Sequence, residues 1–217
     1  MDQVMSRISI PKYSLGEELI NSISHGLGAI FGVTALILMI NKAQTPLSMA
    51  CAVVFGVTMI ALYIVSCVYH ALPPTLPGKR VMRVIDHCNV FLFVFGTYVP
   101  AALLGVGGAL GWILFGVVGF FTILGIVFTT LDIDKYSKAQ VACHLVSGWS
   151  FLAGMPAILA TQAPACGILI VAGGVAYTVG SILYGIGKHH PYMHSVFHLF
   201  CLLGTVLHFA AIYTFLL

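Results

Sequence analysis

Charged side chains are scarce in this chain. Of its 217 residues, 7% are Asp, Glu, Lys or Arg, whereas 60% are hydrophobic. A soluble domain carries roughly 25% charged residues, and no single soluble core could bury so much apolar surface. The shortage of charge therefore excludes a soluble globular domain and indicates a protein whose solvent is the lipid bilayer.

Three further absences narrow the class of protein to which this chain can belong. The six cysteines form no CxxC pair and almost all lie inside apolar runs, so we expect small buried apolar residues rather than a disulfide framework. We also expect no cleavable signal peptide, because a mixed polar segment precedes a first apolar run that is long enough to span a membrane. The runs lack the alternation of apolar and polar residues found in membrane barrels, and only helices suit them.

The apolar residues gather in runs of about 20, the length that a bilayer demands. The runs are residues 20–41, 47–70, 85–105, 109–130, 139–161, 165–187 and 194–216. They predict an all-α membrane protein, a seven-helix bundle forming a single transmembrane domain of residues 19–217 behind an N-terminal segment of residues 1–18. Ser14-Leu15-Gly16-Glu17 fits a capping box, which predicts a helix beginning there.

The distribution of basic residues predicts the orientation. The N-terminal segment and the loops after the second, fourth and sixth runs hold eight of the nine basic residues, and the opposite face holds Lys42 alone. The eight are Arg7, Lys12, Lys79, Arg80, Arg83, Lys135, Lys138 and Lys188. Basic loops stay in the cytoplasm, so we expect a cytoplasmic N-terminus and an external C-terminus.

Two histidines four residues apart, His194 and His198, open the last apolar run. On a helix their side chains lie about 40° apart, so both imidazoles can bind one metal ion. Catalytic zinc uses three protein ligands and one open position, and the best candidate for the third ligand is His70. The alternative is that the spacing is chance, or that the histidines reach out to the headgroup layer.

The predicted depths of the polar residues support a shared site. His70 ends the second run, while Asp86 and His194 open the third and seventh, so all three fall at the cytoplasmic end. Ser66 and His198 lie one turn deeper, roughly 6 Å. We expect Asp86 to hydrogen-bond beside the metal and to act as general base for a bound water, with Ser66 as a hydrogen-bond donor.

Asp86 has a particular importance in this layout. The HExxH motif of soluble zinc proteases carries a catalytic Glu directly after its first histidine. Here that position is Ser195, so the carboxylate must come from another segment. Asp86 is the only acidic residue that the predicted layout places to supply it.

Three polar residues near the start of the first helix share one helical face: Glu17, Asn21 and His25. They could bridge to the loops that carry Arg83 or His87, or hold the first helix against the site. We expect structural roles for them rather than catalytic ones. His87 points about 100° away from its neighbour Asp86, and we expect a loop contact there rather than a metal ligand.

A polar stripe continues along the last run after the histidine pair. Cys201, Thr205 and His208 lie within about 40° of His194 at helical spacing. The stripe indicates either a hydrated cavity or hydrogen bonding between helices, and the second is commoner in bundles. His208 lies roughly 15 Å from His198 along the axis, so it cannot share the same metal ion.

The motifs together resemble the haemolysin III-like bacterial branch of the progestin and adipoQ receptor family, within the wider group that contains the alkaline ceramidases. The matching residues are Glu17-Glu18-x-x-Asn21-x-x-x-His25, Ser66-x-x-x-His70, Arg83-x-x-Asp86-His87 with Gly96-Thr97-Tyr98-x-Pro100, and His194-x-x-x-His198 with Gly204 and His208. They extend over nearly the whole chain. The resemblance implies a multi-pass protein of the bacterial inner (plasma) membrane, with a zinc ion (Zn2+) held by His70, His194 and His198. It also implies that Asp86 and Ser66 lie near the bound water.

Several functions remain open at this point. The first is a zinc-dependent hydrolase of a lipid amide or ester, because family members are described as receptors or as lipid-amide hydrolases. The second is a non-enzymatic sensor or regulator of membrane state, in which zinc joins the second and seventh helices. A pore, haemolysin or transporter is a weaker third choice, since no ionisable residue lies deep in the third, fourth or sixth run apart from Asp86 at the edge of the third. The expected partners are membrane lipids, a lipid substrate or a free fatty acid, and no nucleic acid.

Overall fold

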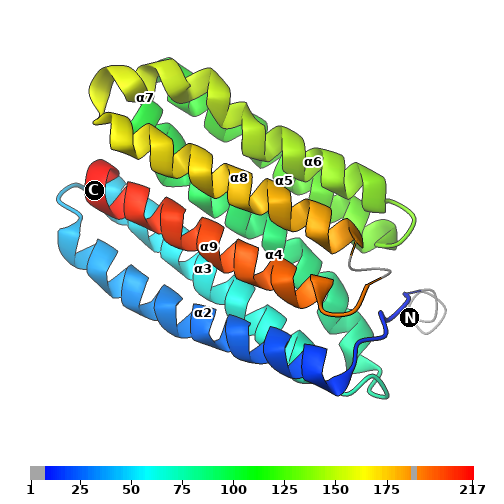
Figure 1. Ribbon diagram of the computed structural model, residues 1–217. Coiled ribbons are helices and arrows are strands. Elements are labelled where there is room, and N and C mark those ends of the chain that lie inside the picture. The colour runs from blue at the N-terminus through cyan, green and yellow to red at the C-terminus, as the bar shows by residue number, and fades with distance from the viewer. Residues whose placement is uncertain (1–7, 187–189) are drawn as a thin grey trace.

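A computed structural model describes residues 8–186 and 190–217 of the chain, and all the regular secondary structure within these residues is helical (Figure 1). The helices are α2 (Leu15–Lys42), α3 (Pro46–Ala71), α4 (Gly78–Pro100), α5 (Gly108–Asp132), α6 (Ser137–Trp149), α7 (Met155–Thr161), α8 (Pro164–Ile186) and α9 (Met193–Ala211). Two π-helical segments, η1 (Ala101–Val106) and η3 (Ile212–Leu216), extend α4 and α9, and a 3-10 segment, η2 (Ser150–Gly154), joins α6 to α7. The described residues thus contain seven candidate spans of 23 to 29 residues. The predicted all-α seven-span bundle is confirmed.

The start of the first span follows from its sequence. Ser14 accepts a hydrogen bond from the Glu17 amide, and the Glu17 carboxylate accepts one from the Ser14 amide at 2.8 Å, which confirms the predicted capping box. Helix α2 therefore begins at Leu15, inside the segment that hydropathy had assigned to the N-terminal tail.

The predicted start of the third span was wrong. Helix α4 begins at Gly78 rather than at residue 85, because its polar first turns are stabilised by partners that hydropathy cannot show. Lys79 pairs with Glu18, and Arg83 pairs with Asp134. Asp86 consequently lies in the third turn of α4, roughly 12 Å along the axis from its start, and does not open the helix.

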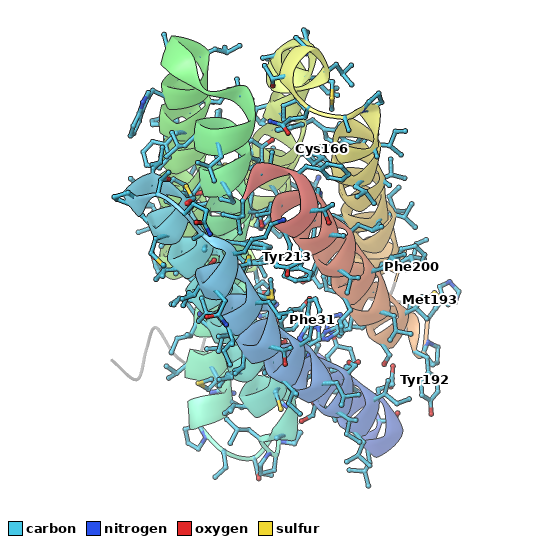
Figure 2. All side chains as sticks on the ribbon, turned by 90° about the vertical axis from the view of Figure 1, so that its left-hand side faces the viewer. Phe31, Cys166, Tyr192, Met193, Phe200 and Tyr213 are labelled. Carbon is cyan, nitrogen blue, oxygen red and sulfur yellow. The ribbon has the colours of Figure 1, made fainter. Side chains whose placement is uncertain are left out.

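Neighbouring helices pack side by side in chain order from α2 to α6, and α8 packs against α9. Contact between α9 and α2 brings the last span against the first (Figure 1). Phe31 of α2 and Tyr213 of η3 lie between these two helices (Figure 2). This closure places the beginning of α9 beside the beginning of α2 and the end of α3.

The bundle contains two apolar clusters and an apolar exterior. One cluster centres on Phe55, Met59 and Tyr63 of α3, and the other on Tyr98 and Val118. Large apolar side chains are exposed on every span, as expected of helices whose outer faces contact lipid. Two of the basic residues used to predict orientation, Arg7 and Lys188, lie outside the described residues, and the orientation itself stays a prediction.

Tyr98 stabilises the place where α6 loses its regular hydrogen bonding. Its hydroxyl donates to the Gly148 carbonyl at 2.8 Å and accepts from the Phe151 amide at 2.8 Å. The Ser150 hydroxyl lies 3.2 Å from the same oxygen. Backbone groups freed within a bilayer need partners inside the protein, and this phenol supplies them.

Tyr98→Phe is therefore expected to lower the free energy of unfolding by about 1–3 kcal/mol, since it leaves a buried amide and carbonyl unsatisfied. Thermal unfolding in detergent, followed by circular dichroism, measures the effect. Tyr136→Phe is the matched control, because Tyr136 packs on Phe128 at the start of α6 and its loss should change stability little. Equal stability of Tyr98→Phe and the wild type would contradict the assignment.

Candidate metal centre

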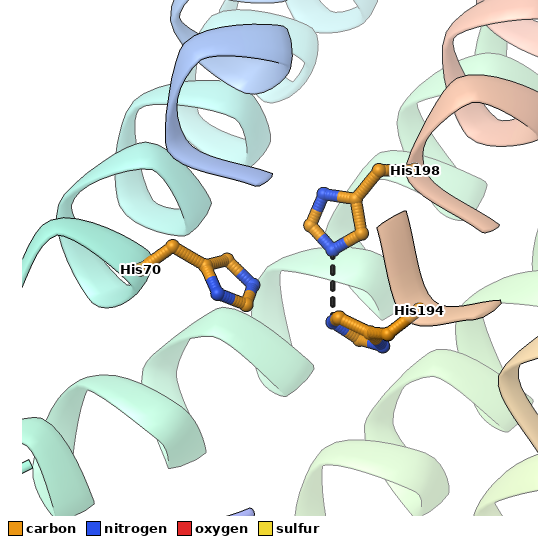
Figure 3. A group of neighbouring side chains, drawn as sticks. All are labelled: His70, His194 and His198. Atoms are coloured by element: carbon orange, nitrogen blue, oxygen red, sulfur yellow. Dashed lines mark hydrogen bonds between the residues drawn. The ribbon is translucent and has the colours of Figure 1, made fainter. Parts of the chain in front are cut away.

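Three histidines converge at one end of the bundle. His70 lies in the last turn of α3, whereas His194 and His198 occupy the first two turns of α9 (Figure 3). All three are buried, with exposed fractions of 7% or less. One nitrogen from each ring lies within 4.8 Å of the others. Among the described residues, this is the one group of three or more His, Cys, Asp or Glu side chains with the spacing of metal ligands.

The ring nitrogens face a common point. Nε2 of His198 lies 2.9 Å from Nε2 of His194, and Nε2 of His70 is buried with no hydrogen-bond partner in residues 8–186 and 190–217. Zinc–nitrogen bonds of 2.0–2.1 Å at tetrahedral angles require ligand nitrogens about 3.3 Å apart. Small ring shifts would bring the three imidazoles to that spacing. Imidazole ligands suit zinc, copper, iron and nickel alike, so the cluster could hold a metal ion whose identity the donor set leaves open.

Asp86 and Ser66 lie beside this cluster. The Asp86 carboxylate lies close enough to His70 and to the hydroxyl of Ser66 to interact electrostatically with both. Both residues are buried. Asp86 reaches this place from the third turn of α4, deeper than its predicted position at the helix start. Their proposed parts in catalysis stay predictions.

The sequence reasoning missed the carboxylate that contacts a histidine of the cluster most directly. Oε2 of Glu18 lies 2.6 Å from Nδ1 of His70, and its other oxygen, Oε1, lies 2.5 Å from Nζ of Lys79. Asp86 is thus not the only acidic side chain placed at the site. A signal was present, because Glu18 shares a helical face with Asn21 and His25.

The three polar residues predicted on the face of α2 have separate contacts. Glu17 accepts a hydrogen bond from the Tyr192 amide at 2.8 Å, joining α2 to the segment before α9. The Asn21 amide nitrogen lies 3.5 Å from Nδ1 of His70. His25 packs on His198 with ring centroids 3.8 Å apart, and neither of its nitrogens has a partner in the part of the chain described. The structure brings Asn21 and His25 to the cluster and leaves Glu17 at the helix cap.

His87 and His208 lie away from the metal cluster. His87 lies within α4, where its Nδ1 donates to the Arg83 carbonyl at 2.9 Å and its Nε2 lies 3.4 Å from the Tyr184 hydroxyl of α8, so these contacts are with helices rather than with a loop. His208 donates through Nε2 to the Ile170 carbonyl of α8 at 3.0 Å. Thr205 of the predicted polar stripe likewise hydrogen-bonds to Tyr63 of α3 and Tyr177 of α8. The stripe makes bonds between helices along this length.

Residues 8–14 contact the end of the bundle that holds the cluster through Tyr13 and Ser9, and we call this segment the N-terminal strap. Within it, the Tyr13 ring stacks on His194 with centroids 4.8 Å apart, and burial raises the pKa of its hydroxyl. The Arg83 guanidinium donates to the Ser9 carbonyl at 2.8 Å and to Asp134 at 3.0 Å. Although partial burial raises the pKa of Asp134, hydrogen bonds from Arg83 and Ser9 hold it below its ordinary value. No feature of the sequence had indicated these contacts.

Asp134→Asn is expected to loosen the strap and to speed tryptic cleavage after Lys12 several-fold at neutral pH. The lowered pKa means that the carboxylate contributes stability above the ordinary Asp value of about 3.9, and that this contribution is lost only as the pH falls through the folded-state pKa. At neutral pH the wild-type pair is therefore intact. Lys138→Gln is the control, because Lys138 is exposed at the start of α6. Unchanged cleavage in Asp134→Asn would show that the ion pair does not hold the strap.

Known proteins are similar to this chain over most of its length. The family described as "Haemolysin-III related" matches residues 13–209. Hemolysin-3 of Bacillus cereus is 31% identical over 205 residues, covering 93% of this chain and 92% of that protein. The Hemolysin-3 homolog of Bacillus subtilis is 30% identical over 196 residues, covering 89% and 91%. The human monocyte to macrophage differentiation factor is 24% identical over 172 residues, covering 75% and 69%.

The matches cover the helices that supply all three histidines and confirm the resemblance drawn from the motifs. Together with the seven apolar helices, they identify a multi-pass bacterial membrane protein. The chain belongs to the haemolysin III-related family.

Proposed function

We propose that this protein is a zinc-dependent hydrolase of a lipid amide or ester bond, acting at the cytoplasmic side of the membrane. The observation that carries the proposal is the convergence of His70, His194 and His198 within 4.8 Å, with the Asp86 carboxylate beside them. Three neutral nitrogen ligands with an open fourth position form a donor set that catalytic zinc uses.

The roles of the side chains follow from that geometry. A bound zinc ion supplies a Lewis acid and lowers the pKa of a bound water toward about 7. In this proposal Asp86, which lies beside His70, would accept a proton from the attacking water, and Ser66 would orient the carboxylate. The buried surroundings exclude bulk water, which strengthens each of these interactions.

The position of the cluster in the spans supports a lipid as substrate. His70 ends one span and His194 begins another, so the cluster lies at the depth of the headgroup layer, where the amide and ester bonds of lipids are found. The spans present large apolar side chains outward, and a lipid would reach the site sideways from the bilayer. The charge distribution along the sequence predicts that this end faces the cytoplasm.

A second function is a sensor or regulator of membrane state with a structural metal. The Tyr13 ring stacked over His194 favours it, because a structural site is closed to solvent whereas a catalytic site keeps an open position. A pore or haemolysin is the third choice, and the name Hemolysin-3 describes the Bacillus cereus relative.

Metal analysis and product release test the first proposal together. Wild-type protein purified in mild detergent is expected to carry about one zinc per chain and to release fatty acid from lipid amides or esters in mixed micelles. Release should stop on chelation and return with added zinc. Bound zinc without release from either bond type would contradict the hydrolase and leave the sensor, whereas protein that binds no metal would contradict both.

A further inference from the structure

A buried chain of contacts joins three helices behind the metal centre. Glu18 of α2 lies between His70 of α3 and Lys79 of α4, with one carboxylate oxygen directed to each. The side chains of His70 and Lys79 are fully buried, and 11% of the Glu18 side chain is exposed. Nζ of Lys79 also donates to the Leu72 carbonyl at 2.7 Å and lies over the Tyr69 ring. We propose that Glu18, anchored by Lys79, is a positioning residue that sets the tautomer of His70 and turns its Nε2 toward the metal.

The hydrogen-bonding roles of the carboxylate and the imidazole allow one position for the proton on His70. A carboxylate can only accept, so the 2.6 Å contact requires a proton on Nδ1 of His70. Nε2 of a neutral imidazole is then the acceptor with a free lone pair. This nitrogen is buried without a partner among the described residues, and it lies on the side of the ring that faces His194 and His198 (Figure 3). The Asn21 amide, at 3.5 Å, is too distant to compete for Nδ1.

Lys79 determines which atom Glu18 presents to His70. An ammonium group can only donate, so it holds Oε1 and fixes the carboxylate with Oε2 toward the ring. Pairing also offsets the cost of burying each charge. Metal-binding histidines commonly donate their second nitrogen to a carboxylate, which fixes ring orientation and raises the basicity of the ligand.

This inference rests on the proposed metal binding. It predicts that a single variant loses metal affinity and that a second substitution restores it, with uncharged side chains replacing charged ones in both cases. In Glu18→Gln, Lys79 would take the amide oxygen and leave the amide NH2 facing Nδ1. Nδ1 would then be an acceptor, so the proton would move to Nε2 and block the metal-binding nitrogen. Metal affinity is expected to fall 10- to 100-fold. In Glu18→Gln/Lys79→Met the amide is free to turn its oxygen toward Nδ1, and affinity should recover toward the wild-type value.

Titration with Zn2+ and with Co2+ in detergent measures these effects, since cobalt reports its ligands through its visible spectrum. Glu17→Gln is the matched control, because the neighbouring carboxylate bonds to Ser14 and Tyr192 and not to a histidine. It should retain wild-type affinity and the wild-type cobalt spectrum. Lys79→Met alone keeps the carboxylate acceptor, so it should bind metal with a wild-type spectrum even if its melting temperature falls.

The outcomes separate this inference from the proposed function. A wild-type affinity and cobalt spectrum in Glu18→Gln would overturn it, and so would a double variant that binds more weakly than Glu18→Gln. If Glu18→Gln fails to fold, the nitrogen-15 chemical shifts of His70 in metal-free wild-type protein test the tautomer directly: a proton on Nδ1 supports the inference, and a proton on Nε2 overturns it. Wild-type protein that binds neither ion would overturn the metal centre itself.

Discussion

His194→Ala and His70→Ala are each expected to contain no zinc, against about one zinc per chain in the wild type. Each substitution removes one of three nitrogens that lie within 4.8 Å of one another, and two imidazoles do not complete a zinc site. Since metal binding contributes directly to folding stability, each variant should also lose several kcal/mol of unfolding free energy. Elemental analysis and thermal unfolding, with and without added zinc, measure both effects.

The matched control lies on the same helix. His208→Ala removes an imidazole whose Nε2 bonds to the Ile170 carbonyl of α8, so zinc content should remain at the wild-type level while stability falls modestly. If His194→Ala retained the metal, the proposed centre would be wrong. Equal loss of metal in all three variants would instead indicate general unfolding.

Asp86→Asn is expected to keep its zinc and to lower the rate of the proposed hydrolysis 10²- to 10⁴-fold, the usual contribution of a general base. The amide has the shape of the carboxylate and can accept a hydrogen bond from Ser66, but it cannot accept the proton of a bound water. Zinc content and the rate of fatty acid release, measured on the same preparation, separate binding from catalysis.

Asp132→Asn is the control for this comparison. Asp132 ends α5 and accepts hydrogen bonds from the amides of Asp134 and Lys135, which an asparagine oxygen can also do. Its rate should equal that of the wild type. Full activity in Asp86→Asn would remove the proposed base from the mechanism, and the carboxylate of Glu18 would then be the remaining acidic group at the cluster.

The spans could be predicted from the sequence because a bilayer imposes length and hydropathy on each helix. The prediction failed where charged side chains are paired inside the protein. Lys79 and Arg83 made the start of α4 look like a loop, although their partners, Glu18 and Asp134, stabilise them within a helix. Hydropathy scores each charged residue by itself and takes no account of the partner that offsets the cost of burying it.

The histidine cluster could be predicted from the sequence for a different reason. The spacing of His194 and His198 is local, and His70 could be added because the ends of the runs fix its depth. Glu18, Lys79 and Tyr13 escaped because their contacts depend on how α2, α4 and the strap pack around α3 and α9. Periodicity puts Glu18 on one helical face with Asn21 and His25, but it does not show which neighbouring helix that face contacts.

The paired charges behind His70 also affect what can occupy the fourth position of the proposed centre. Glu18 and Lys79 cancel each other, so a divalent ion beside ionised Asp86 would leave one uncompensated positive charge in a medium of low polarity. Electroneutrality therefore favours an anion as occupant. Hydroxide would meet this demand, and so would the carboxylate that the proposed hydrolysis would liberate, so the product would compete for the site in the next turnover.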